Sequence, residues 1–373
     1  MEYELLTKCQ TKINQPTVKK RTKIIIGIVV LLIAIRISLP FVVTKYVNKV
    51  LSEIEGYEGS IEDVDLHLYR GAYKIIGLEL FSVEKDIKTP FVAIDNIDIS
   101  VEWKALFDGS IVGEIILENP KLNFAAGPEE EEVQTGEEND WTQTIKDLVP
   151  LQINRFEIIN GKVSYVDDYS SPKVDIYFNE MNALATNLNN SKDFTTDLPS
   201  KITMKSKTIG EGNFDLEMDI NILKEIPDFD VNLKLDEVKL PALNNFFKAY
   251  GNVDAESGTL SLYSELALID KDLNGYFKPL TKDIKILDWK NEEENVFGKL
   301  WEALIGLGGN ILENQKIDQI GSKIPIKGNL DDTKVGAWKA LISLLKNAYL
   351  NPLQKQLDQT ILVREREIIN KEE

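Results

Sequence analysis

The stretch Phe214–Ile222 reads FDLEMDINI, an unbroken alternation of apolar side chains with acidic or amide ones. Successive side chains of a β-strand point to opposite faces, so this order predicts a strand with one apolar and one polar face. A second run, Val231–Leu235 (VNLKL), alternates in the same way. The apolar positions of the two runs include Leu216, Met218, Ile220, Val231, Leu233 and Leu235.

Comparable runs fill much of the chain between Ser60 and Leu287, and Gly, Asn or Pro residues separate them. Short alternating runs broken by turn residues predict antiparallel strands, each with one dry and one wet face. Turns are expected near Gly71, at Asn119-Pro120 and at Gly161. Two architectures bury such apolar faces: two sheets that close into a sandwich, or one curled sheet with an apolar groove. The periodicity does not choose between them.

Four segments have helical spacing instead: Trp141–Leu148, Pro241–Tyr250, Phe297–Leu307 and Trp338–Tyr349. The last two carry apolar stripes and form a pair of amphipathic helices near the C-terminus. Stripes of this kind are more often core packing than membrane or partner surfaces.

The N-terminal region contains the apolar stretch Ile24–Val43 (IIIGIVVLLIAIRISLPFVV), preceded by Lys20, Arg21 and Lys23. About 20 apolar residues span a bilayer as a helix, and flanking basic residues stay on the cytoplasmic side. The prediction is a single transmembrane helix with a cytoplasmic N-terminus. A cleaved signal peptide is the competing interpretation, but Arg36–Tyr46 offers no small-x-small cleavage site.

Three residues are candidates for the membrane interface: Arg36, Lys45 and Tyr46. Arg36 lies inside the apolar stretch near its exit end, where its long side chain can reach the outer headgroups. Pro40 is expected to kink or end the helix. Apolar residues at helical spacing over Tyr46–Ile54 suggest that the helix continues outward and stops near Gly56.

The composition restricts the partners. The chain has 373 residues, 61 of them acidic and 43 basic, for a net charge of −18. Since nucleic-acid binding depends on basic groups that neutralise phosphates, nucleic acid is not expected as a partner. The single cysteine, Cys9, rules out an internal disulfide framework.

The expected organisation has six parts. They are a basic cytoplasmic tail (1–23), the transmembrane helix (24–43), a first β region (44–126), an acidic flexible loop (127–140), a second β region with inserted helices (141–335), and a C-terminal helix with a charged tail (336–373). The fold class is therefore mainly β (α+β): an N-terminal transmembrane helix followed by antiparallel strands.

The sequence carries few signs of catalysis. His67 is the only histidine, no set of His and Cys residues suggests zinc, and no glycine-rich phosphate loop is present. Asp167 and Asp168 are adjacent in a strand, so their side chains should point apart. No catalytic residue, metal ligand or cofactor is assigned, and the chain is expected not to be an enzyme.

Several segments together resemble a known family, in the same order along the chain. They are Ser38–Tyr46 (SLPFVVTKY), Gly56–Leu80, Pro90–Phe124, Leu148–Asp168, Pro172–Asn187, Leu240–Tyr263, Gly275–Asp283 (GYFKPLTKD) and Lys323–Asn347. The family is the AsmA-like superfamily of bacterial envelope proteins, in its domain of unknown function 748 group. The resemblance implies an inner-membrane anchor, an elongated, curled, groove-like antiparallel sheet in the periplasm, and a role in phospholipid movement or envelope integrity.

The leading hypothesis is therefore a non-enzymatic, single-pass inner-membrane protein whose sheet binds lipid acyl chains. Its expected partners are the bilayer, a phospholipid ligand and another envelope protein. The groove candidates are Leu216, Met218, Ile220, Val231, Leu233 and Leu235, although an ordinary sandwich core explains the same pattern. A structural or interaction protein of the envelope is the alternative, and a hydrolase is a third hypothesis.

Overall fold

The computed structural model describes residues 20–54, 56–67, 71–83, 87–101, 112–127, 133–134, 152–188, 197–221, 224, 226–251, 253–289, 320–321 and 323–329. Residues 1–19 of the predicted N-terminal tail, the helix over Trp141–Leu148 and the two C-terminal helices lie outside these residues. Residues 20–23, which were predicted as part of the tail, belong to the helix α1.

The described chain is a long helix followed by a series of strands. The helix is α1 (Lys20–Ser52), and the first strands are β1 (Tyr57–Ser60), β2 (Asp63–His67), β3 (Ala72–Ser82), β4 (Val92–Val101), β5 (Val112–Glu118), β6 (Lys121–Ala126) and β7 (Val133–Gln134). They are followed by β8 (Gln152–Asp167), β9 (Val174–Thr186), β10 (Ser200–Thr208), β11 (Asn213–Asn221), β12 (Asp228–Lys239), β13 (Val253–Ile269), β14 (Asp272–Trp289), β15 (Ile320–Gly321) and β16 (Ile324–Asn329). Short helical segments are η2 (Ile209–Glu211), η3 (Leu240–Leu243) and α4 (Asn244–Gly251).

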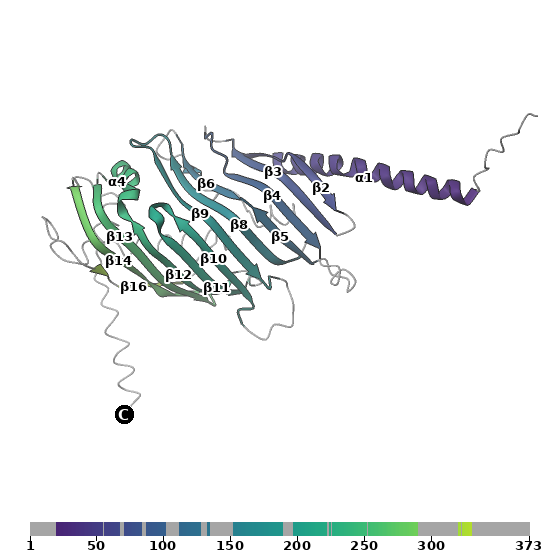
Figure 1. Ribbon diagram of the computed structural model, residues 1–373. Helices are drawn as coiled ribbons and strands as arrows, with labels where there is room; N and C mark the ends of the chain where they lie inside the picture. Colours follow the sequence, from purple (N-terminus) through teal and green to yellow (C-terminus); the bar gives the residue numbers. More distant parts are fainter. Residues whose placement is uncertain are drawn as a thin grey trace, which may run out of the picture.

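All of these strands belong to one sheet, in the order β1-β3-β4-β5-β8-β9-β10-β11-β12-β13-β14-β15, with β2, β6, β7 and β16 paired alongside this path. The sheet curves, and α1 extends away from its β2–β3 end (Figure 1). The mainly β fold with an N-terminal apolar helix is confirmed. Among the described residues the strands form a single curled sheet and not the two sheets of a sandwich.

The sheet is mixed, whereas a purely antiparallel one was predicted. β5 and β6 both pair with β8 in parallel, and they also both pair with β4. The two short strands are therefore consecutive halves of one bent strand. Asn119-Pro120 forms the bend, with Asn119 at a φ of 53°, and not the predicted turn.

A second predicted turn, at Gly161, is an irregularity inside a strand. β8 continues through this point for 16 residues. Its pairing with β9 shifts register around Gly161, and the preceding Asn160 has a φ of 54°. A β-bulge places one extra residue in a strand without ending it, and Asn tolerates positive φ better than most residues. The predicted turn at this position is therefore wrong.

The predicted acidic loop also contains a short strand. β7 pairs with β6, and the side chain of Gln134 is buried, where its Nε2 donates a hydrogen bond to the Asn123 carbonyl at 2.9 Å. The helix predicted over Pro241–Tyr250 is confirmed as η3 followed by α4.

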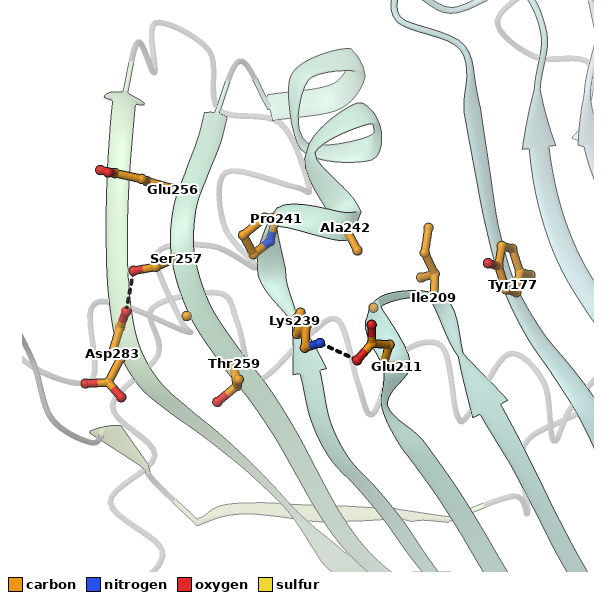
Figure 2. Close-up of a pocket in the computed structure, with 12 residues that line it drawn as sticks. Tyr177, Ile209, Glu211, Lys239, Pro241, Ala242, Glu256, Ser257, Thr259 and Asp283 are labelled. Atoms are coloured by element: carbon orange, nitrogen blue, oxygen red, sulfur yellow. Dashed lines mark hydrogen bonds and ion pairs between the residues drawn. The ribbon is translucent and has the colours of Figure 1, made fainter.

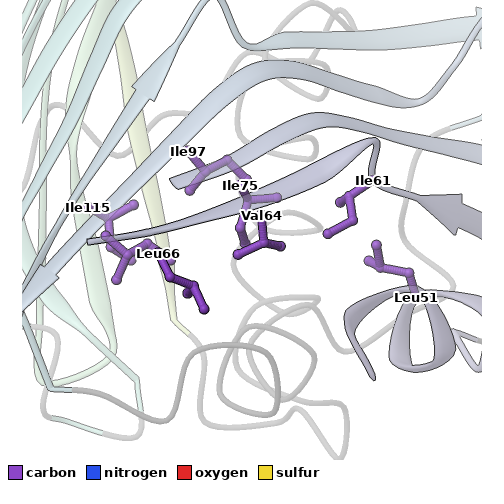
Figure 3. Packing of buried hydrophobic residues seen from close by; sticks show 8 residues of the cluster. Leu51, Ile61, Val64, Leu66, Ile75, Ile97 and Ile115 are labelled. Atoms are coloured by element: carbon purple, nitrogen blue, oxygen red, sulfur yellow. The ribbon is translucent and has the colours of Figure 1, made fainter. Parts of the chain in front are cut away.

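The helix α1 continues from the apolar stretch to the edge of the sheet. It does not end at Pro40 but at Ser52, close to the predicted end. Figure 3 shows a buried cluster that includes Leu51 and the strand residue Val64. Leu39, Val43 and Val47 of the helix pack against this cluster. These helix residues recur every four positions and so share one face. The helix is thereby fixed along the β1–β2 edge of the sheet.

A polar contact supports this packing. The Asn48 Oδ1 accepts a hydrogen bond from the Ile61 backbone N–H at 2.7 Å, and the Asn48 Nδ2 donates to the Ile61 carbonyl at 3.4 Å. Both backbone groups of Ile61 are satisfied by one helix side chain. The helix and the edge of the sheet therefore have a defined relative register.

Candidate functional site

The apolar face of the sheet is continuous from its first strands to its last. Residues directly opposite each other on neighbouring strands project to the same face, so the pairing registers define rows across the sheet. The first row consists of Leu66, Tyr73, Ile99, Ile115, Phe156, Ala185, Ile202, Met218, Val231, Leu266, Gly275 and Ile326.

A second row lies beside the first, two residues away along each strand. It consists of Val64, Ile75, Ile97, Leu117, Ile158, Ala183, Met204, Leu216, Leu233, Ser264 and Phe277. Ser264 is its one polar member, and the Ser264 Oγ donates a hydrogen bond to the Tyr276 carbonyl at 2.9 Å. With a strand spacing of about 4.8 Å, each row extends for roughly 50 Å.

The six predicted groove residues all lie on this face. Met218 is opposite Val231, Leu216 is opposite Leu233, and Leu235 is opposite Phe214. Leu216, Met218, Ile220 and Val231 belong to one apolar cluster, whereas Leu233 and Leu235 are half-buried on the same face outside it.

Other members of that cluster were not singled out from the sequence. They are Phe229, Leu266, Leu268, Leu273, Phe277 and Ile326. Leu266 and Leu268 had the required alternation, but the strand register that places them opposite Val231 and Phe229 is a long-range property. A sequence pattern identifies the face of one strand and does not identify its neighbour.

The opposite face of the same strands is charged. Lys205 lies 3.4 Å from Asp215 on the neighbouring strand, and Lys234 lies 2.5 Å from Asp236. Asp236 also accepts a hydrogen bond from the Tyr263 hydroxyl. Burial opposes ionisation of Asp236, but the bonds from Lys234 and Tyr263 outweigh it and hold the pKa of Asp236 below its ordinary value. Its charged side chains make this face suited to contact with water.

The helix α4 bridges strands that are far apart in the sheet. Phe247 packs on Leu240 and Ala255, next to β13, while the Tyr250 hydroxyl donates to Asp167 of β8. The hydroxyls of Tyr250 and Tyr165 lie 2.9 Å apart. Burial and the bond to Asp167 raise the pKa of Tyr250 above its usual range. One helix thereby ties the β8–β9 part of the sheet to β13.

A hollow of about 700 Å³ lies beside η3, at the end of β12–β14. Its lining includes Lys239, Glu211 and Glu256 (Figure 2). Lys239 forms an ion pair with Glu211, and Glu256 forms one with Lys285. Asp283 adds a further carboxylate to the lining, and the other charged groups are engaged in these ion pairs, so the chemistry of the hollow does not favour a particular ligand.

The predicted interface residues separate into two kinds. The Arg36 Nη2 lies 4.0 Å from the Asp65 Oδ1 of β2, so this arginine contacts the sheet. Lys45 and Tyr46 are exposed. The segment Thr22–Ser52 is long and apolar enough to cross a membrane, which is consistent with a single-pass anchor.

The residues considered for catalysis are not brought together. The buried Asp167 binds Tyr250, whereas the exposed Asp168 pairs with Lys173 at 2.9 Å, so the two carboxylates point apart. His67 lies 3.7 Å from Asp65. Within the described ranges, no group of three or more His, Cys, Asp or Glu residues could hold a metal ion.

A scan against models of known protein families gives no match, and a search of curated proteins finds no similar sequence.

Proposed function

We propose that this chain is a membrane-anchored, non-enzymatic protein that binds lipid acyl chains along the apolar face of its sheet. The observation that carries the proposal is the pair of apolar rows, about 50 Å long and interrupted only at Ser264 and Gly275, which begin beside the membrane helix. Acyl chains are long and apolar, and transferring them from water to an apolar surface is favourable. The charged opposite face keeps such a complex in water.

The cellular role follows from the resemblance of the sequence to AsmA-like envelope proteins. On this proposal α1 is the anchor in the bacterial inner membrane, the sheet lies in the periplasm, and the protein contributes to phospholipid transport or envelope maintenance. The basic residues before the apolar stretch support a cytoplasmic N-terminus. A phospholipid is the expected ligand, and a second envelope protein is an expected partner.

Site-specific photocrosslinking tests the proposal in the full-length protein. A photoreactive amino acid replaces Met218 or Leu233, which are half-buried on the apolar face, and the cells are labelled with radioactive phosphate before irradiation. Matched controls carry it at Glu217 or Asn232, which are exposed on the same strands but on the other face. We expect labelled phospholipid only at Met218 and Leu233. Equal labelling on both faces, or none on either, contradicts the proposal.

A structural or interaction protein without bound lipid is the alternative. The low exposure of Val231, Leu266 and Leu268 favours it, because these side chains already pack as a core. Mass spectrometry of lipids that remain with the purified protein separates the two hypotheses. Protein that keeps its fold, carries no lipid and gives no crosslink at Met218 supports the alternative.

A further inference from the structure

The contact between the membrane helix and the sheet begins inside the apolar stretch and continues beyond its end. Arg36 is the thirteenth residue of Ile24–Val43, and its guanidinium lies 4.0 Å from Asp65. The Asp65 carboxylate also lies 3.7 Å from the His67 Nε2. Charged residues within membrane segments are commonly paired with one another, and this contact provides Arg36 with such a partner.

On the two sides of α1, the exposed apolar surface ends at different heights along the helix axis. On the side that faces the sheet, Leu39 and Val43 already pack against strand residues, and Arg36 lies one turn before them. Elsewhere on the helix surface, Phe41 is 73% exposed and Val42 is 62% exposed. Exposed apolar residues thus continue past the level at which the sheet begins.

The helix rise gives the difference in height. From Ile24 to Val43 the helix extends for about 30 Å, which equals the thickness of the hydrocarbon core. The exposed Lys45 and Lys49 follow and fit the outer headgroup layer. Leu39 lies about 6 Å before Val43 along the axis, and Arg36 lies about 10 Å before it.

We infer that the β2–β3 end of the sheet reaches below the outer headgroup layer, so that its surface contacts the acyl chains of the outer leaflet. The first positions of the two apolar rows, Leu66 and Val64, are the sequence neighbours of Asp65. The rows therefore start at the level of the acyl chains. Because α1 packs over Leu66 and Val64, which are buried, the path of an acyl chain from the leaflet to the rows would lead around the helix without crossing the headgroups. This path rests on the proposed function, whereas the depth of the strands does not.

The charges near this end are compatible with that depth. Lys74 is opposite Asp65 on β3, and its ammonium group lies 3.1 Å from Glu118. Arg36, Asp65 and His67 form a second cluster, and Asp98 lies opposite Lys74 on β4. Pairing lowers the cost of placing charged groups at the edge of the hydrocarbon region.

Depth-dependent fluorescence quenching tests the inference. Cys9 is replaced by Ser in the full-length protein, and single cysteines that carry an environment-sensitive fluorophore are introduced as Ala72→Cys, Ala267→Cys or Ile28→Cys. Ala72 lies at the start of β3, beside the membrane end, and Ala267 is a half-buried alanine on the same face in β13. Ile28 lies in the exposed part of the helix and reports insertion. The proteins are reconstituted into phosphatidylcholine vesicles whose acyl chains are brominated near the headgroup.

We expect the Ala72→Cys label to be quenched at least half as strongly as the Ile28→Cys label, and the Ala267→Cys label not to be quenched. Quenching at Ile28→Cys alone overturns the inference, because the sheet would then stand clear of the acyl chains. Quenching at Ala72→Cys without any lipid crosslink at Met218 confirms the depth and rejects the proposed function. Crosslinking at Met218 without quenching at Ala72→Cys supports the proposed function and rejects the inferred depth.

Discussion

Tyr250 and Asp167 are separated by 83 residues in the sequence, yet the Tyr250 hydroxyl donates a hydrogen bond to the Asp167 carboxylate. The other Asp167 oxygen accepts hydrogen bonds from the backbone N–H groups of Tyr169 and Ser170, each at 2.9 Å. Asp167 is only 7% exposed. The carboxylate is therefore satisfied on both oxygens, and it fixes α4 over the end of β8.

Tyr250→Phe should destabilise the protein by about 1–3 kcal/mol, because the Asp167 carboxylate stays buried and loses its hydroxyl donor. The measurement is the midpoint of denaturant unfolding in detergent. Asp168→Asn is the matched control, since Asp168 forms only an exposed pair with Lys173. That control should change stability by no more than about 1 kcal/mol. Equal effects of the two substitutions contradict the role assigned to Tyr250.

Leu268 and Ile269 are neighbours in β13 with opposite environments, as Leu268 is 0% exposed and Ile269 is 44% exposed. Leu268→Ala should cost about 2–5 kcal/mol, the range for truncation of a buried leucine. Ile269→Ala should cost less than half as much. A larger loss at Ile269 in the same unfolding measurement means that the apolar face has been assigned to the wrong side of the sheet.

Gly275 is the one position of the first row without a side chain. A Cβ there would lie 2.1 Å from the Glu265 carbonyl oxygen and 2.8 Å from the Leu266 Cα. Both atoms belong to the backbone of the neighbouring strand and cannot move aside without disturbing the β13–β14 pairing. Gly275→Ala should destabilise by about 1–3 kcal/mol or more. Asn274→Ala, at the exposed neighbouring position, should have little effect on the thermal unfolding midpoint.

Asp236 should contribute to the dependence of stability on pH. Its pKa is below the ordinary value of 3.8 in the folded protein, so its contribution is present above that ordinary value. The contribution is lost as the pH falls through the lower folded-state pKa. Asp236→Asn should therefore lose less stability than the parent protein when the pH falls from about 6 to about 3. Parallel curves for the two proteins contradict the assignment.

Local sequence patterns predicted the strands well because each strand has its own apolar and polar alternation. Phe214–Asn221 of the run FDLEMDINI lie in β11, with Leu216, Met218 and Ile220 on the apolar face and Glu217 exposed. The helix over Pro241–Tyr250 was equally local. In both cases the signal extends over no more than a few turns or strand residues.

The two wrongly predicted turns involve residue types that occur both in turns and at irregular positions within strands. Asn119-Pro120 and Gly161 have the composition of turns, but here they form a bend and an irregularity within strands. A positive φ at Asn is compatible with either result. Whether the chain reverses or continues is decided by pairing with a neighbouring strand, which is β8 for Asn119-Pro120 and β9 for Gly161, and no local pattern contains this information.

The candidate site was only partly accessible from sequence for the same reason. Arg36 was identified as a snorkelling residue, but its contact with Asp65 depends on how α1 packs against β2. The apolar positions of β11 and β12 were correctly identified. Their continuation through Ile202, Leu266 and Ile326 follows from strand order and register.

Each strand contributes at most one residue to each apolar row, so the number of strands sets the length of the rows. Inserting or deleting a complete antiparallel hairpin would alter the length of both rows by about 10 Å. The residues outside the hairpin would still project to the same face of the sheet as before, because the period of two restarts with each strand. The protein can therefore be lengthened or shortened in modular steps, with its anchor and its water-facing surface preserved.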